Sequence, residues 1–499
     1  MSISPAVRVP GIDRSFSIGR ILTVLMLPLG MSLMAVSAVN VALPTIEVGL
    51  GATSSDIQWV LSGYGLAFGM SLIPAGRLGD ARGRGSYFVA GVALFTLASV
   101  LCGLAPTPLV LNIFRLLQGI GSGLIGPQTT GMILQYFSGH HRAKAFSLFG
   151  LVISVSVAIG PLFAGSIIAL LGPELGWRGA FLINGPLGLI ALVMALRWLP
   201  FETERHRRRE RAKGAATESP DLDPVGAVLV AGAVLCLMTP FMMRGAWEWW
   251  LLLPLGIALA VAWVVWERRY QSRGREPMVR MDLFRYPSFS FGTAISATQF
   301  LGGASTFAIL ALFLQQGVGL SALETGLVTL PNALLSALTA VWVSRHVLGH
   351  GRRIVVVCLS IMITGVLATL SLAPFVAAHE LPAAWMAATL ALIGLGMGAY
   401  GSANQTLALH DVPIEVGGSA GAVKQTAERT SAAMGNAVVT AIFFAVAGIA
   451  GLATAFMVSF AVIASFMITA LGLGIGELVN ARRRHAASTA GVGEALQTA

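Results

Sequence analysis

The stretch GRLGDARGRG (76–85) lies between two apolar runs of about twenty residues each, 57–76 and 86–105. Glycine permits the sharp turn that two consecutive helices need. A carboxylate in Asp80 is suited to accept backbone N–H groups at a helix N-terminus. Arg84 is suited to pair with an acid or a phosphate. The stretch therefore predicts a tight cytoplasmic turn that controls a helix contact, and the alternative is a basic loop that only fixes orientation.

Apolar runs of the same length recur along the whole chain. Of its 499 residues, 56% are hydrophobic and 11% are charged, and the mean hydropathy is +0.79. Soluble domains are about 25% charged. In lipid the backbone must satisfy its own hydrogen bonds, so helices or a closed barrel are required, and runs that do not alternate favour helices. The runs are 21–44, 57–76, 86–105, 109–136, 145–171, 179–199, 224–243, 249–266, 289–316, 324–344, 353–373, 383–407, 417–447 and 451–473.

Lysine and arginine are distributed unequally between the two sides of this arrangement. With a cytoplasmic N-terminus, the inner loops and tails hold 27 of the 32 Lys and Arg residues, and the outer loops hold Arg178 and Arg244. Such an asymmetry is the positive-inside pattern. The net charge of +10 therefore indicates topology and contact with anionic lipids rather than binding to nucleic acid.

The runs predict an all-α polytopic membrane protein with 14 transmembrane helices, in two six-helix bundles joined through an inserted two-helix hairpin. Two such halves around a midplane site are typical of transporters that alternate their access. The expected segments are an N-terminal cytoplasmic tail, a bundle, a cytoplasmic linker, the hairpin, a second cytoplasmic linker, a second bundle and a cytoplasmic tail, at 1–20, 21–200, 201–222, 223–266, 267–288, 289–475 and 476–499.

Other classes of site find little support. The cysteines Cys102, Cys236 and Cys358 lie in apolar runs without disulfide or metal spacing. His346 and His350 are four residues apart, but no acid lies near them, so we expect no metal site. No phosphate-binding loop or cofactor fingerprint is found, which excludes ATP-driven transport by this chain and predicts no cofactor. The eight histidines are dispersed, which disfavours a membrane enzyme.

Several motifs resemble the major facilitator superfamily. In the loop at 76–85, the matching residues are Gly76, Asp80, Gly83 and Arg84. RLLQG, from Arg115 to Gly119, resembles the motif of its fourth helix. Gly160 and Pro161 resemble its antiporter motif, although Ser156 and Ala164 replace two of the usual glycines. The resemblance implies that Gly160 and Pro161, like the loop residues, serve the conformational change.

A closer similarity is to the fourteen-helix drug:proton antiporter family. It is carried by WRGAFLINGPLG (177–188), VNVALP (39–44), IQWVLSGY (57–64) and the run WERR to LF (266–284). The similarity implies export of drugs or other small amphipathic solutes, coupled to protons, by a monomer in the cell membrane with both termini cytoplasmic. One departure concerns the first span, where Ala35 replaces the family's usual aspartate and leaves proton coupling open.

Three charged residues inside spans are candidates for proton coupling. Arg115 is one, because an arginine inside a membrane is costly and therefore indicates a functional site; the alternative is a structural arginine that carbonyl groups bind at a helix end. Glu428 lies about 16 Å into its span, near the middle of a ~30 Å core. Lys424 is four residues earlier on the same helical face. Glu428 is therefore either the carboxyl that takes up the transported proton or a structural charge that Lys424 and the adjacent Arg429 neutralise.

Methionine, aromatic and amide side chains predict a cavity for amphipathic substrates, because methionine and aromatic rings repack around different shapes; ordinary helix packing is the alternative. The candidates are Met34, Asn40, Gln299, Phe300, Phe307, Met397, Tyr400 and Asn404. We also expect Asp80 to contact the start of the thirteenth span, near 417–419, in an outward-facing state. An uptake symporter or a transporter of lipid-like solutes from the same superfamily remains the main alternative to export.

Overall fold

The computed structural model describes residues 6–8, 15–201, 222–242, 247–320, 322–343, 346–347 and 351–497. The expected linker at 201–222 falls almost wholly outside the described residues. The side chains of Asn40 and Pro161, and those from residue 481 onward, are also outside them. The chain divides into two compact units, Met1–Leu283 with Val412–Ala433 and Phe284–Asp411 with Met434–Ala499, which we call unit 1 and unit 2.

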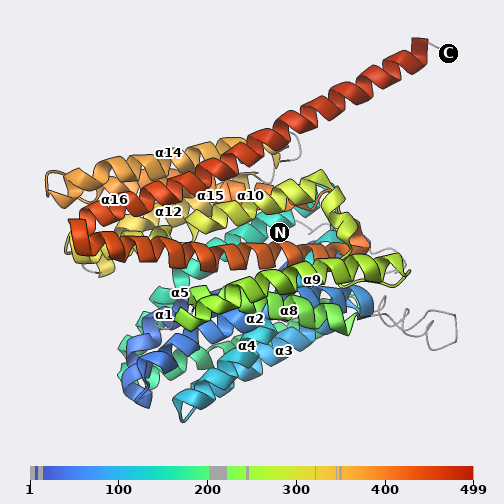
Figure 1. Ribbon diagram of the computed structural model, residues 1–499. Helices are drawn as coiled ribbons and strands as arrows, with labels where there is room; N and C mark the ends of the chain where they lie inside the picture. The colour runs from blue at the N-terminus through green and yellow to red at the C-terminus, as the bar shows by residue number, and fades with distance from the viewer. Residues whose placement is uncertain are drawn as a thin grey trace. The chain divides into compact units, whose positions relative to one another are not determined.

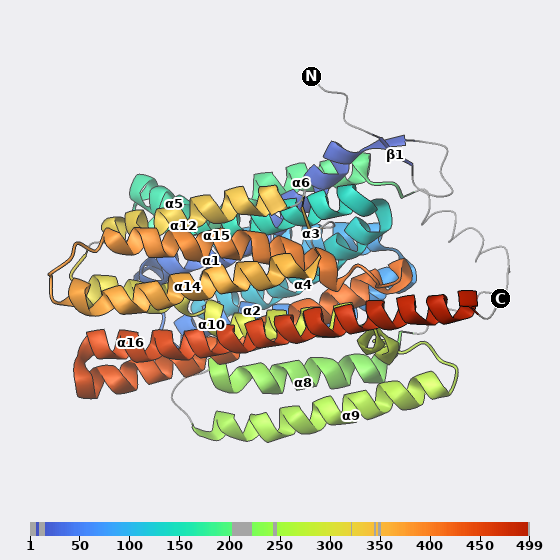
Figure 2. The same cartoon turned by 90° about the horizontal axis from the view of Figure 1, so that it is seen from above.

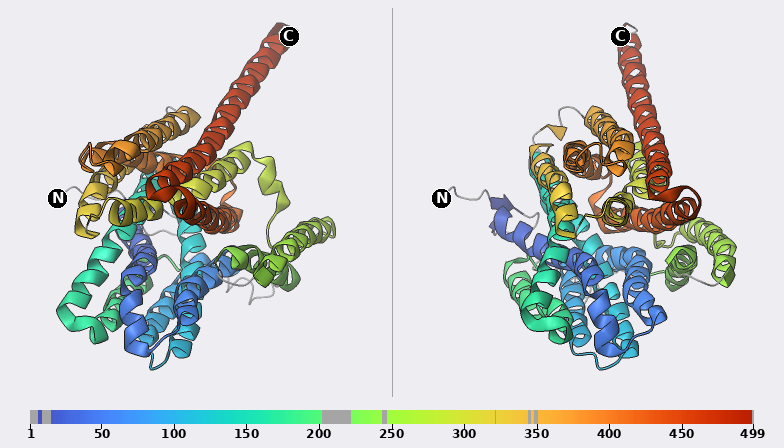
Figure 3. Two further views of the ribbon diagram at one scale, coloured as in Figure 1. Left: turned by 60° about the vertical axis from the view of Figure 1, so that its left-hand side comes forward. Right: turned by 90° about the vertical axis from the view of Figure 1, so that its left-hand side faces the viewer.

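Unit 1 is built from long helices that pack in pairs (Figure 1). Helix α1 packs on α5, both α2 and α3 pack on α4, and α8 pairs with α9 and contacts α2. Figure 3 shows α8 and α9 (green) beside the blue helices of the same unit. The helices are α1 (Ile18–Leu50), α2 (Ser54–Arg82), α3 (Arg84–Gly103), α4 (Pro108–Tyr136), α5 (Gly139–Leu182), α6 (Asn184–Trp198), α8 (Pro224–Met242) and α9 (Leu252–Ser272), with short 3-10 helices at Trp247–Leu251, Met281–Arg285 and Ile414–Val416 and the first part of α16 (Gly417–Gln497).

The described part of unit 2 is built from helices. Helices α12, α14 and α10 all pack on α15, and α16 turns back on itself within this unit (Figure 2). Its helices are α10 (Pro287–Gly303), α11 (Thr306–Leu312), a π-helix at Phe313–Gly317, α12 (Ala322–Val343), α14 (Arg352–Ala377), α15 (Trp385–Ala408) and the rest of α16. The run expected over 289–316 lies within one candidate membrane span, Pro287–Gly317, inside which α10 ends at the glycine pair 302–303, where helix propensity is low.

Helix ends follow from local sequence. Thr53 and Asp56 form a capping box at the start of α2, in which the Thr53 Oγ1 accepts the Asp56 N–H at 3.2 Å and Asp56 Oδ2 accepts the Thr53 N–H at 2.9 Å. Thr107 caps α4, and Pro108 occupies its first position, where no N–H is needed. Gly51 ends α1 with a φ of 59°. These local signals fix where α1 ends and where α2 and α4 begin.

Two glycines mark equivalent bends in the two units. Gly172 in α5 has φ 77° and ψ 169°, and Gly451 in α16 has φ 82° and ψ 168°. Both angles lie where side chains are rarely tolerated, and each bend reverses a long helix into the next. The matching angles show that α5 in unit 1 and α16 in unit 2 contain the same kind of bend.

Eleven helices in the described part of the chain are long and apolar enough to cross a membrane. Each of the fourteen runs expected from the sequence overlaps helical residues, and the longest of the eleven stretches, Ile414–Asn480, covers two of those runs. A short antiparallel pair of strands, β1 (Ala6–Arg8) and β2 (Ser15–Ser17), interrupts the all-α prediction within the expected N-terminal tail.

Candidate functional site

A single residue forms the turn between α2 and α3. Helix α2 ends at Arg82 and α3 begins at Arg84, so Gly83 alone connects them with φ 124° and ψ 121°. Only glycine adopts such an angle without strain. The Gly83 N–H donates to the Gly79 carbonyl at 2.9 Å and closes the last turn of α2. The turn therefore fixes Asp80 and Arg84 on consecutive helix ends.

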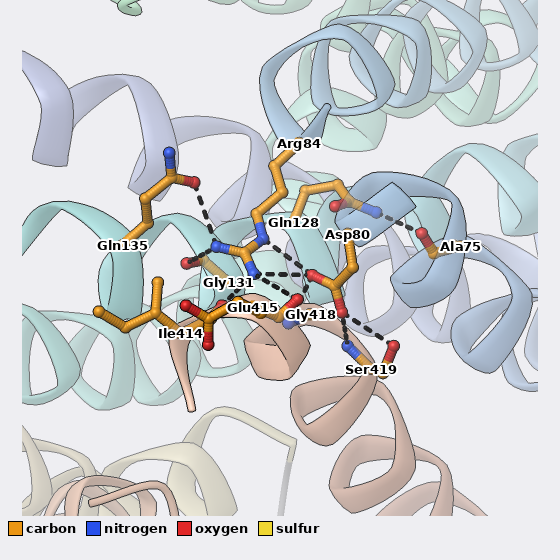
Figure 4. A network of polar contacts seen from close by, with 10 residues as sticks. All are labelled: Ala75, Asp80, Arg84, Gln128, Gly131, Gln135, Ile414, Glu415, Gly418 and Ser419. Carbon is orange, nitrogen blue, oxygen red and sulfur yellow. Dashed lines mark hydrogen bonds and ion pairs between the residues drawn. The ribbon is translucent and has the colours of Figure 1, made fainter. Parts of the chain in front are cut away.

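Asp80 contacts the first turn of α16. Its Oδ1 accepts the Gly418 N–H at 3.1 Å, and its Oδ2 accepts the Ser419 N–H at 2.7 Å and the Ser419 hydroxyl at 2.8 Å (Figure 4). The Asp80 side chain is 2% exposed. A carboxylate at a helix N-terminus is stabilised by the unpaired N–H groups and by the positive end of the helix dipole. The structure thus brings Asp80 to the residues near which the sequence analysis places its partner.

Arg84 completes this network from the start of α3. Its Nε donates to Asp80 Oδ1 at 2.9 Å, and its Nη1 donates to the Gly131 carbonyl at 2.9 Å and to Gln135 Oε1 at 3.1 Å. Its Nη2 pairs with Asp80 at 2.8 Å and donates to the Ile414 carbonyl. The buried guanidinium and carboxylate therefore neutralise each other, as a buried ion pair must, and join α2, α3 and α4 to the start of α16.

Close backbone approach explains Gly76 and Gly418. A Cβ added at Gly76 would lie 2.7 Å from the Gly418 carbonyl oxygen and 2.8 Å from Ala422 Cβ. A Cβ at Gly418 would lie 2.6 Å from Asp80 Oδ1. No real Cβ contact is that short, so larger residues would push α2 and α16 apart and lengthen the hydrogen bonds to Asp80.

Helix α4 supplies network residues that the sequence analysis missed. Gln128 Nε2 donates to the Ala75 carbonyl in α2 at 2.6 Å, and Gln135 accepts from Arg84. With Gly131 these residues recur at i, i+3 and i+7, which places them on one helical face. Amides at that spacing inside an apolar run were the available signal. The pair of Arg77 with Glu276, at 2.5 Å, was also missed, because nothing in the sequence connects positions so far apart.

Arg115, a candidate for proton coupling, is 1% exposed in α4. Its Nε donates to the Val60 carbonyl at 2.9 Å, and its Nη1 donates to Gln118 Oε1 at 2.7 Å. Its guanidinium carbon lies 4.3 Å from the centre of the Tyr64 ring. None of these described contacts of Arg115 is a carboxylate, so carbonyl, amide and aromatic groups stabilise its charge.

Lys424 and Glu428 form the ion pair that their spacing predicts. Lys424 Nζ donates to Glu428 Oε1 within one turn of α16, and the side chains are 3% and 15% exposed. The neighbouring Arg429 lies over the ring of Phe68, with 5.2 Å between its guanidinium carbon and the ring centre. Lys424 is therefore the hydrogen-bonded partner of Glu428, whereas the described side-chain contact of Arg429 is with the Phe68 ring.

The remaining predicted residues are distributed over both units. Gly160 in α5 packs against the α1 backbone, where an added Cβ would be 3.0 Å from the Met34 carbonyl. Pro161 and Asn40 lie in α5 and α1, with side chains outside the described set. In unit 2, Tyr400 is buried and Met397 is half-buried on α15. Gln299 is buried and Phe300 half-buried on α10, and Phe307 is half-buried on α11, beyond the break between these helices.

Asn404 belongs to a second polar network, inside unit 2. Its Nδ2 donates to the Gly292 carbonyl at 2.9 Å and to Ser296 Oγ at 2.8 Å, and its Oδ1 accepts from Arg352 at 3.0 Å. Arg352 also pairs with Glu477 at 2.8 Å. Arg352 begins α14 as Arg84 begins α3, and each binds the helix that follows. Both the oxygen and the nitrogen of the Asn404 amide therefore form hydrogen bonds between helices of unit 2.

Comparison with known proteins agrees with this geometry. The family model described as "Major Facilitator Superfamily" matches residues 25–436. The probable actinorhodin transporter of Streptomyces coelicolor is 34% identical over 84% of this chain and 71% of its own length. The tetracenomycin C resistance and export protein of Streptomyces glaucescens is 31% identical over 83% of this chain and 74% of its own.

Among solved structures, the human organic anion transporter MFSD10 superposes with a TM-score of 0.63 at 14% identity, over 92% of this chain and 99% of its own. At that identity the likeness concerns the fold alone. Extensive matches in sequence and fold agree with the loop at 76–85, and the chain belongs to the major facilitator superfamily.

Proposed function

We propose that this member of a transporter family exports drug-like or antibiotic-like amphipathic molecules from the cell by alternating access. The names of its relatives support export, since two of them are described as a transporter of actinorhodin and an exporter of tetracenomycin C. As a family member the chain is a multi-span membrane transporter of small molecules and not an enzyme. Fourteen helices in a 6 + 2 + 6 arrangement, in the cell membrane with both termini cytoplasmic, form part of the proposal.

The contact of Asp80 with the start of α16 is the observation that carries the mechanism. Gly76, Gly83 and Arg84 support a contact that is tight, buried and charge-assisted. In alternating access such a contact holds one state and is broken in the other. Its carboxylate gains from the helix dipole only while α16 stays in place. Bending near Gly160 and Pro161 in α5 would accompany the exchange.

Proton coupling is the second part of the proposal, with Glu428 as the carboxyl that exchanges the proton. Its side chain is 15% exposed and pairs with Lys424, so release of that pair would leave a carboxylate at membrane depth that takes up a proton. Arg115 would then stabilise the polar interior without exchanging protons, because its described partners are carbonyl, amide and aromatic groups.

Efflux from reconstituted vesicles tests this function. A panel of lipophilic cations, neutral amphiphiles and aromatic anions is loaded, and release is followed with and without a pH gradient. We expect Asp80→Asn to slow release while expression is unchanged, and Glu428→Gln to abolish the response to the gradient. Glu174→Gln, which removes an exposed carboxylate from α5, is the control. Release by Asp80→Asn at the wild-type rate would refute the gating role.

A further inference from the structure

Four side chains form a continuous row across unit 1, which we call the arginine–aromatic row: Arg115, Tyr64, Phe68 and Arg429. The Arg115 guanidinium carbon lies 4.3 Å from the Tyr64 ring centre. The rings of Tyr64 and Phe68 stack, with centres 6.2 Å apart and planes 15° apart. The Arg429 guanidinium carbon lies 5.2 Å from the Phe68 ring centre. Each contact is of the cation–π or stacked-ring type.

The two ends of the row differ in what their guanidinium groups do. The N–H groups of Arg115 are bound by the Val60 carbonyl and the Gln118 amide, and this end is buried. Phe68 and Arg429 are both half-buried. Within the described part of the chain, Arg429 makes no ion pair and no hydrogen bond. Arg115 thus has the partners of a structural arginine, whereas the N–H groups of Arg429 are available to donate hydrogen bonds to another group.

The charge around the row is positive. Lys424 neutralises Glu428. Of the charged side chains named here, Arg115 and Arg429 therefore leave two positive charges without a balancing carboxylate. Helix α1 has no acid before Glu47. Arg429 lies twelve residues after Gly417, or about 18 Å along the helix, which is near the middle of a ~30 Å core. An arginine at that depth is costly unless a partner binds it.

We propose that the arginine–aromatic row selects the substrate class, and that the exported molecule is an aromatic anion. Its carboxylate or ionised phenol would accept N–H groups of Arg429, and its planar rings would lie against the Arg429 guanidinium and the half-buried Phe68 side chain. A guanidinium matches a carboxylate with two parallel hydrogen bonds, and the ring face favours a flat partner. A lipophilic cation would be repelled. The inference rests on the proposed export function and names its substrate.

The direction of export agrees with this charge. An anion that leaves a cell whose interior is negative moves down the electrical gradient. The export of such a molecule is therefore driven by the membrane potential in addition to any proton coupling through Glu428.

Binding to the purified, detergent-solubilised protein tests the inference with three probes of one shape: an anthraquinone carboxylate, the uncharged carboxamide, and an anthraquinone with a trimethylammonium group. We expect the carboxylate to bind about tenfold more tightly than the carboxamide, as a charge-assisted pair predicts, and the cation most weakly. Arg429→Gln should remove the tenfold preference and leave carboxamide binding unchanged. Arg429→Lys should keep most of the preference.

Lys144→Gln is the control variant, because it removes one positive charge from an exposed site. Equal melting temperatures of wild type and variants establish that the variants are folded, and Arg429→Lys provides the comparison if Arg429→Gln is unstable. The inference is wrong if the cation binds as well as the carboxylate, if Arg429→Gln weakens all three probes equally, or if no probe binds the wild type. Efflux of the bound probes from vesicles is scored separately: anion-selective binding without efflux would overturn export and leave the inference intact.

Discussion

Replacing Asp80 with Asn removes the charge from the contact with α16 and leaves its shape nearly unchanged. In the wild type the carboxylate accepts two backbone N–H groups and one hydroxyl from Gly418 and Ser419, and it pairs with Arg84. The amide of Asn has one oxygen acceptor. Its NH₂ group would lie against either the donor groups of Gly418 and Ser419 or the Arg84 guanidinium. The variant therefore loses at least one charge-assisted hydrogen bond and the ion pair.

The size of the effect follows from the number of contacts. A hydrogen bond to a charged group contributes about 1.5–3 kcal/mol, and a neutral bond about 1 kcal/mol. At the lower figure of about 1.5 kcal/mol each, exchanging the three charged contacts with α16 for one or two neutral ones costs about 3 kcal/mol. Since 1.4 kcal/mol is a factor of ten, the ratio of closed to open contact should fall about 100-fold.

Amide hydrogen exchange of the segment 417–424 measures this change directly. The N–H groups of Gly418 and Ser419 exchange only when the Asp80 contact opens. We expect their exchange in Asp80→Asn to be about 100-fold faster, and Glu174→Gln, at an exposed position, to leave it unchanged. Exchange at the wild-type rate in Asp80→Asn would show that the carboxylate does not hold α16, and the reasoning on the contact would be refuted.

Three further changes have defined outcomes. Gly76→Ala should lower stability by about 1–3 kcal/mol through overpacking on α16, seen as a lower melting temperature, whereas Gly472→Ala, with nothing within 4 Å of its added Cβ, should not. Lys424→Gln should cost about 3 kcal/mol by leaving Glu428 unpaired, and a double variant with Glu428→Gln should recover the melting temperature; no recovery would contradict the pair. Asn404→Ala should cost about 3 kcal/mol by opening the unit 2 network, and an unchanged melting temperature would contradict it.

The helices could be predicted from the sequence because a backbone in lipid must satisfy its own hydrogen bonds. Apolar runs long enough to span a membrane must be helical, and the fourteen expected runs overlap helix. The break between α10 and α11 was not predicted, because a glycine pair inside an apolar run is also compatible with a continuous helix. The bend at Gly172 continues directly into helix, where the sequence suggested a short loop.

Contacts of the site could be predicted from the sequence where they are local or belong to a known motif. Asp80, Gly83 and Arg84 are close in sequence, and Lys424 with Glu428 follows from one helical turn. Contacts between distant segments were not readable, since no spacing rule connects Arg352 to Glu477. The row formed by Phe68 and Arg429 was missed for the same reason.

A distance measurement between spin labels at Arg82 and Glu415 tests the central claim most directly. Both side chains are exposed in unit 1, on either side of the contact between Asp80 and α16. We predict two distance populations in membranes, with the longer one increased by Asp80→Asn and by a transported substrate. A single distance that neither change alters would contradict a contact that opens and closes during transport.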